Sequence, residues 1–211
     1  MDDRQAVPAA LLRARATGWA FATAPLWLLA AWVILWPLGG RSGPGTAWNL
    51  AHVGWLVGFA CLALVCGELR RRALERSPDQ DRAVNVVTGL TLAGLALSSA
   101  QMVVDLVAGL DALNYDDMQA RADAITQWLG LDLLLSTVGP PLVFIGLAGL
   151  LTMVARRRGA SPFGPVLVVS AFVVIAVDED LTPIALALML LALAPTGWRM
   201  LREHPRIRLA V

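Results

Sequence analysis

The residues of this chain that could do chemistry are ionisable and amide side chains placed inside apolar stretches or at their ends. Six of them are candidate ligand- or ion-binding residues: His52, Gln101, Asp105, Asp132, Asp178 and Asp180. Three polar residues near them in sequence are secondary candidates: Asn49, Ser98 and Ser136. Grouped carboxylates attract a cation or a proton, and a nearby imidazole adjusts their charge. Because ionisable residues in apolar helices are costly, they are treated as a functional-site hypothesis.

The apolar stretch 83–110 is the one around which these candidates are arranged. Its small and polar residues recur at steps of three and four, which places them on one face of a helix. They are Thr91, Gly94, Ser98, Gln101 and Asp105. Lipid offers no hydrogen-bond partners, so this face must be directed towards protein or water. We therefore expect this helix at the centre of a bundle.

The residue types exclude several classes of catalytic and cofactor site. All seventeen basic residues are Arg, which removes a Schiff-base lysine and a P-loop lysine. His52 is the one histidine in an apolar stretch, so multi-His metal sites and bis-His haem are excluded. No G-x-S-x-G or H-E-x-x-H motif is present. We expect no cofactor and no metal, and the balance is against an enzyme.

Composition indicates an all-α, polytopic integral membrane protein. The 211 residues are 57% hydrophobic, and 16% are charged, compared with about 25% in soluble domains. The mean hydropathy is +0.65. The charges are clustered rather than spread, which argues against a nucleic-acid partner and for the lipid bilayer. Heavy use of Arg, Ala, Gly and Leu is typical of a GC-rich bacterial genome.

Six apolar stretches are predicted to span the membrane within one domain over 18–198. Their approximate bounds are 18–38, 48–69, 83–110, 129–155, 162–177 and 181–198. The fifth is short, reaching about 22 Å of a hydrocarbon core about 30 Å thick. Residues 1–17 form a segment before the bundle, and residues 199–211 form an Arg-rich tail after it.

The loop between the third and fourth stretches is acidic but has helical periodicity. Its apolar residues are Tyr115, Met118, Ala122, Ile125 and Leu129. This spacing predicts a short amphipathic helix at the outer surface, leading into the fourth membrane helix. The Pro140-Pro141 pair is expected to bend that fourth helix.

Arginine placement predicts the topology. With six spans and the N-terminus inside, the inner segments hold fifteen Arg, and the outer segments hold Arg41 and Arg121. This bias predicts that both termini are cytoplasmic and that the protein lies in the bacterial inner membrane. His52, Asp105 and Asp132 then all lie one to two turns below the outer surface. The short fifth stretch could draw residues 178–180 to the same layer.

Each candidate also has a plain structural interpretation. Asp105 and Asp132 can be solvated at the interface, and His52 can be a hydrogen-bonded bundle residue. Asn49 is expected to cap the second helix or to bond a neighbour. Residues 178–180 can form a solvated turn, Glu68 is expected to pair with the arginines after it, and the tryptophans are expected to be interfacial anchors.

Three functions remain open from the sequence. The first is binding or transport of a small molecule, cation or proton through an outward-facing acidic pocket. The second is a non-catalytic membrane subunit or scaffold that forms a homo-oligomer or binds another membrane protein through its small-residue faces. The third is an intramembrane enzyme acting on lipid, with His52 as base, which no motif supports. The sequence favours the first.

Overall fold

The computed structural model describes residues 3–36, 43–75, 81–131, 133–158 and 162–203, which are almost entirely helical. The elements are α1 (Asp3–Leu35), α2 (Thr46–Leu74), α3 (Asp81–Leu110), α4 (Tyr115–Leu129), the π-helix η3 (Leu133–Val138), α5 (Gly139–Arg158), α6 (Phe163–Val177), the 3-10 helix η4 (Glu179–Leu181) and α7 (Thr182–Glu203).

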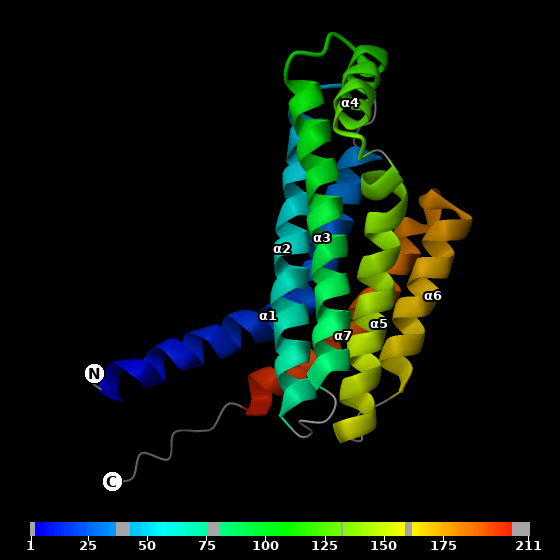
Figure 1. The fold of residues 1–211 in the computed structure, drawn as a ribbon. Helices are drawn as coiled ribbons and strands as arrows, with labels where there is room; N and C mark the ends of the chain where they lie inside the picture. Colours follow the sequence, from blue (N-terminus) through cyan, green and yellow to red (C-terminus); the bar gives the residue numbers. More distant parts are fainter. Residues whose placement is uncertain (1–2, 37–42, 76–80, 132, 159–161, 204–211) are drawn as a thin grey trace.

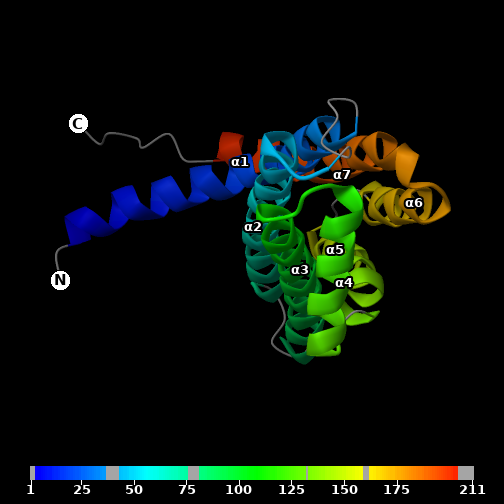
Figure 2. The same cartoon turned by 90° about the horizontal axis from the view of Figure 1, so that it is seen from above.

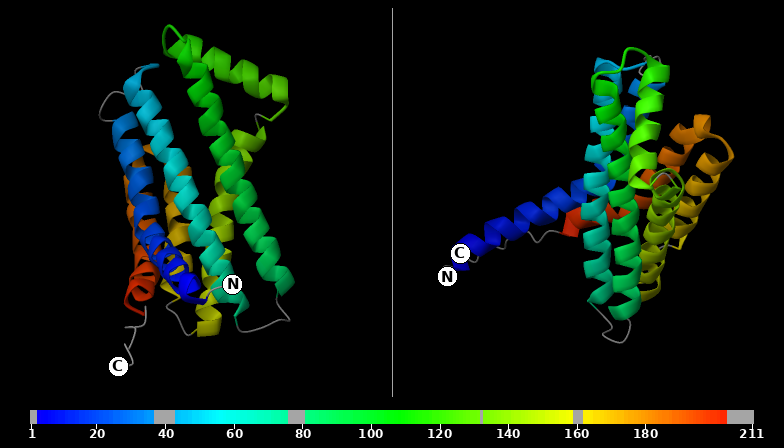
Figure 3. Two further views of the ribbon diagram at one scale, coloured as in Figure 1. Left: turned by 90° about the vertical axis from the view of Figure 1, so that its left-hand side faces the viewer. Right: turned by 45° about the horizontal axis from the view of Figure 1, so that its top comes forward.

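The long helices pack side by side in a ring (Figures 1 and 2). Helix α2 packs between α1 and α3, and α5 packs against both α3 and α2. Helix α6 lies between α5 and α7, and α7 closes the ring by packing on α1. Helix α4 turns back from the end of α3 at a steep angle to the bundle axis (Figure 3).

Within the described residues, five helical stretches are long and apolar enough to cross a membrane. They are Arg15–Leu35, Thr46–Leu74, Arg82–Leu110, Leu133–Arg156 and Glu179–Arg202. Helix α6 is apolar but shorter, as expected from the sequence. The prediction of an all-helical protein with several membrane-length helices is therefore confirmed.

Several helices extend beyond the apolar stretches that predicted them. Helix α2 continues through the Arg-rich segment to Leu74 because Glu68 pairs along the helix with Arg71 and Arg72, at 2.6 Å in both cases. The expected pairing of Glu68 is thus found. Arginine is also a good helix former, so an Arg-rich end does not stop a helix.

The fourth membrane stretch differs from its predicted start at residue 129. Helix α4 ends at Leu129, and Gly130 follows with φ 64°, a left-handed conformation that suits glycine at a helix end. The next helical turns form the π-helix η3. Pro140 and Pro141 follow directly and have no N–H to donate, so the helix widens ahead of them.

Small residues let the helices approach closely. A Cβ on Gly94 of α3 would lie 2.8 Å from the carbonyl oxygen of Gly139 and from the backbone nitrogen of Val143 on α5. A Cβ on Gly58 of α2 would lie 2.5 Å from Cδ2 of Leu28 on α1. The small and polar face of α3 is therefore directed towards protein, with Thr91 fully buried.

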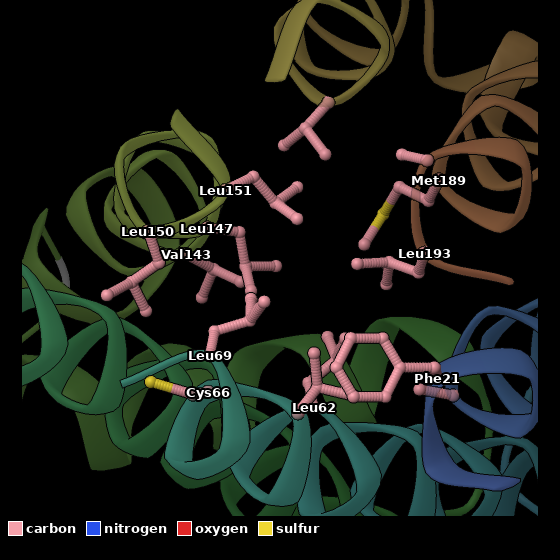
Figure 4. Packing of buried hydrophobic residues seen from close by; sticks show 14 of the residues in the cluster. Phe21, Leu62, Cys66, Leu69, Val143, Leu147, Leu150, Leu151, Met189 and Leu193 are labelled. Carbon is pink, nitrogen blue, oxygen red and sulfur yellow. The ribbon is translucent and has the colours of Figure 1, made fainter. Parts of the chain in front are cut away.

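The apolar core fills the lower and middle parts of the ring. Figure 4 shows Phe21 of α1, Leu62 and Leu69 of α2, and Leu193 of α7 directed towards one another. All four are almost completely buried. The outer face of a helix in this core carries large, exposed apolar side chains, such as Leu64 of α2.

Helix α4 follows α3 in the acidic stretch of the chain and packs against α3. Met118 and Ala122 are buried against Val104 and Ala108 of α3. The side chain of Asn114 accepts a hydrogen bond from the Asp117 amide and caps the first turn. Hydrogen bonds from the Leu113 amide and from Arg121 hold the pKa of the Asp117 carboxyl below its ordinary value.

Candidate functional site

A cavity of about 450 Å³ lies inside the ring and extends from its middle towards the end where α4 lies. Helices α1, α2, α3, α5, α6 and α7 all contribute to its walls, together with η3 and η4. Most of the lining is apolar, and it includes six aromatic side chains: Trp32, Trp36, Trp48, Trp55, Phe59 and Phe144. The volume falls within the range of small-molecule sites.

A polar cluster lies in this cavity where α2 meets α3. Asp105 accepts a hydrogen bond at Oδ1 from Nε2 of Gln101, over 2.9 Å. Its Oδ2 faces Nε2 of His52 at 3.6 Å. The Trp48 indole donates to the Asp105 backbone carbonyl at 3.2 Å and lies against the His52 ring, with centroids 4.1 Å apart. Asp105 is thus held from three directions.

The hydrogen bonds fix which nitrogen of His52 faces the carboxylate. Nδ1 lies 2.8 Å from the Trp48 carbonyl oxygen, which can only accept, so Nδ1 carries a proton. Nε2 is therefore the nitrogen that faces Asp105. The His52 side chain is 4% exposed and that of Asp105 is 18% exposed. The carboxylate keeps access to the cavity while the imidazole is enclosed.

The acidic turn contributes a different residue from those predicted. Glu179 and Thr182 line the cavity, whereas Asp178 and Asp180 do not, although all three acidic side chains of the turn are exposed. The Asp178 side chain instead accepts from the Asp180 amide and caps η4. Asp178 and Asp180 thus do not line the cavity, and a role for them in ligand binding stays a prediction.

Four predicted polar candidates remain: Ser98, Asn49, Asp132 and Ser136. Ser98 lines the cavity one turn from Gln101. The cap expected at Asn49 is wrong, because α2 begins at Thr46 with Gly45 as its N-cap. The buried Oδ1 of Asn49 has no hydrogen-bond partner in the described part of the chain. Asp132 lies outside the described residues, as does the side chain of Ser136, so their places in this layer stay predictions.

Sequence reasoning missed the aromatic wall. Tryptophans were expected mainly as interfacial anchors, but four of them line the cavity. The signal was present in α2, where Trp48, His52, Trp55 and Phe59 follow one another at steps of three and four. An aromatic face shared with a buried histidine indicates an internal wall rather than a lipid-facing belt.

Comparisons with protein-family models, with curated proteins and with solved structures find no match for this chain. The geometry and chemistry of the cavity therefore carry the functional argument.

Proposed function

We propose that this multi-pass membrane protein binds a small organic cation with an aromatic or apolar body in the cavity between its helices. The Asp105 carboxylate, held by Gln101 and open to an aromatic chamber, carries this proposal. The carboxylate supplies the charge partner, and tryptophan faces attract a cation through their ring quadrupoles. The apolar walls accept the rest of the molecule.

The balance of charge in the cavity supports a cationic ligand. Among the described lining residues the ionisable groups are His52, Asp105 and Glu179. Two carboxylates and one imidazole thus line the cavity, so acidic groups outnumber basic ones. In a surrounding of low dielectric constant an unbalanced negative charge strongly favours a bound cation. The subunit or scaffold and lipid-enzyme hypotheses gain no comparable support from the cavity.

Binding can be tested with two probes of equal shape and opposite charge. Tetraphenylphosphonium is expected to bind the purified protein and tetraphenylborate is not, because only the cation is attracted to Asp105. Asp105→Asn is expected to weaken tetraphenylphosphonium binding at least tenfold, since a cation in the cavity loses its charge partner. Isothermal titration calorimetry and quenching of the cavity tryptophans measure both affinities.

The matched control is Asp123→Asn, which removes an exposed carboxylate of α4 at the same end of the bundle. It is expected to leave tetraphenylphosphonium binding unchanged. Equal binding of the two probes, or wild-type affinity in Asp105→Asn, would show that the cavity does not select cations.

We also propose six spans, with α6 as a short one, in the bacterial inner membrane with both termini cytoplasmic. The Arg-rich ends of α2, α5 and α7 lie together, opposite α4 (Figure 1). The positive-inside rule assigns that end to the cytoplasm. The polar end of the cavity then faces outward and the proposed ligand enters from outside.

Cysteine labelling in intact cells tests this orientation. In a Cys61→Ala, Cys66→Ala background, Gln119→Cys on α4 is expected to react with a membrane-impermeant maleimide. Glu75→Cys at the end of α2 is expected to react only after the cells are opened. Both positions are exposed, so access depends on the side of the membrane. The reverse pattern would invert the proposed topology.

A further inference from the structure

A second hollow lies on the outside of the bundle, between α1 and α7. It has a volume of about 490 Å³, and every residue that lines it is apolar or glycine. Its walls include Ala22 of α1 and Ala194 of α7, whose small side chains leave the space open. This groove is separate from the cavity that holds Asp105 and lies nearer the Arg-rich end.

Close backbone contact holds the two helices together beside the groove. A Cβ on Gly197 would lie 2.6 Å from the carbonyl oxygen of Gly18, so the helices touch there. Pro195 also lies in the wall and cannot donate a backbone hydrogen bond. The shape is therefore built by glycine, alanine and proline at fixed positions.

The two walls carry the same pair of side chains. Trp19 on α1 and Trp198 on α7 border the groove and are 57% and 55% exposed. Arg15 precedes Trp19 by four residues and Arg202 follows Trp198 by four, which places each arginine one helical turn beyond its tryptophan. Both arginines lie beyond the same end of the groove, because α1 and α7 are antiparallel there, with Gly18 next to Leu201 and Gly197 next to Phe21.

The positive charges of these two arginines are available to a ligand. The Arg202 guanidinium lies over the Trp198 ring, 4.8 Å from its centroid, which orients it at the mouth of the groove. Arg15 and Arg202 form no ion pair within the part of the chain that the structure describes. A planar guanidinium binds phosphate oxygens through paired hydrogen bonds.

We propose that this groove binds an anionic phospholipid of the surrounding bilayer. An acyl chain lies along the apolar groove, the glycerol region lies level with the two tryptophans, and the phosphate lies between Arg15 and Arg202. Interfacial tryptophan marks the headgroup level, and a basic pocket selects anionic headgroups. The site holds a structural lipid at the inner leaflet and is independent of the ligand proposed for the internal cavity.

Native mass spectrometry tests the proposal on the full chain. The purified protein is loaded with equal amounts of phosphatidylglycerol and phosphatidylcholine that have identical acyl chains. The wild type is expected to retain phosphatidylglycerol in preference. Arg15→Gln and Arg202→Gln are each expected to lower that preference about fivefold. Ala194→Phe fills the groove and is expected to reduce retention of both lipids.

Arg156→Gln is the matched control, since Arg156 is an exposed arginine at the same end of the bundle on α5. Its lipid preference is expected to equal that of the wild type. Equal retention of both lipids by the wild type would overturn the proposal. It would also be overturned if Arg156→Gln lowered the preference as much as Arg202→Gln, because the selectivity would then come from overall surface charge.

Discussion

Replacing Gly94 by alanine is expected to destabilise the folded protein by roughly 3 kcal/mol, in the upper part of the range for overpacked sites. The added methyl group would lie 2.8 Å from the Gly139 carbonyl oxygen, the Leu142 Cβ and the Val143 backbone nitrogen. Two of these atoms belong to the backbone of α5 and cannot rotate away. Helices α3 and α5 must therefore separate, which equilibrium unfolding in detergent measures.

The control for this substitution is available one and a half turns earlier on the same helix. A Cβ on Gly89 would meet no atom within 4 Å. Gly89→Ala is therefore expected to be neutral or slightly stabilising, since alanine favours the helix by about 1 kcal/mol. If Gly94→Ala had the same free energy of unfolding as the wild type, the contact between α3 and α5 would be looser than the structure shows.

Glu68→Gln is expected to have a similarly large effect, about 3 kcal/mol, because it leaves a buried positive charge without a partner. The Glu68 side chain is 8% exposed, and that of Arg72, which it meets at 2.6 Å, is 10% exposed. Glutamine keeps the shape and a hydrogen-bond acceptor but removes the negative charge. The midpoint of unfolding in denaturant reports the loss.

Two further variants separate charge from packing at this site. Glu75→Gln removes a carboxylate that pairs with the exposed Arg71, so a loss below about 1 kcal/mol is expected. Combining Glu68→Gln with Arg72→Met removes both buried charges and is expected to recover most of the lost stability. If the double variant were as unstable as Glu68→Gln alone, the unpaired charge would not be the cause.

The face of α3 and its meeting with α2 could be predicted from sequence. Thr91, Gly94 and Ser98 repeat at helical steps, and lipid cannot satisfy a polar face, so burial of that face follows from elementary physics. The equal depth of His52 and Asp105 followed from the expected topology, because antiparallel neighbours bring such residues to one level, but their approach to 3.6 Å is seen only in the structure. Both inferences rest on the spacing of residues along a helix and on their depth in the membrane, and both quantities can be estimated from the sequence.

The rest of the site depends on rotations that no single sequence determines. Which of the residues 178–180 borders the cavity depends on the short turn η4, where each step rotates the side chain by about 120°. The positions of the tryptophans are equally hard to predict, because the same residue type forms the interfacial belt and the wall of an internal cavity. The π-helix lies between the helix end at Gly130 and Pro140, and the helix propensities of its residues do not predict it.

The π-helix sets which side chain of its segment enters the cavity wall. A π-helix places more residues in each turn than an α-helix does. If η3 tightened to α-helical geometry, the chain before it would advance by one residue and rotate by about 100°. Leu135, which lines the cavity and is 2% exposed, would then be exchanged for a neighbour in the wall. The chamber could thus change its lining next to α3 while α5 beyond the prolines stays in place.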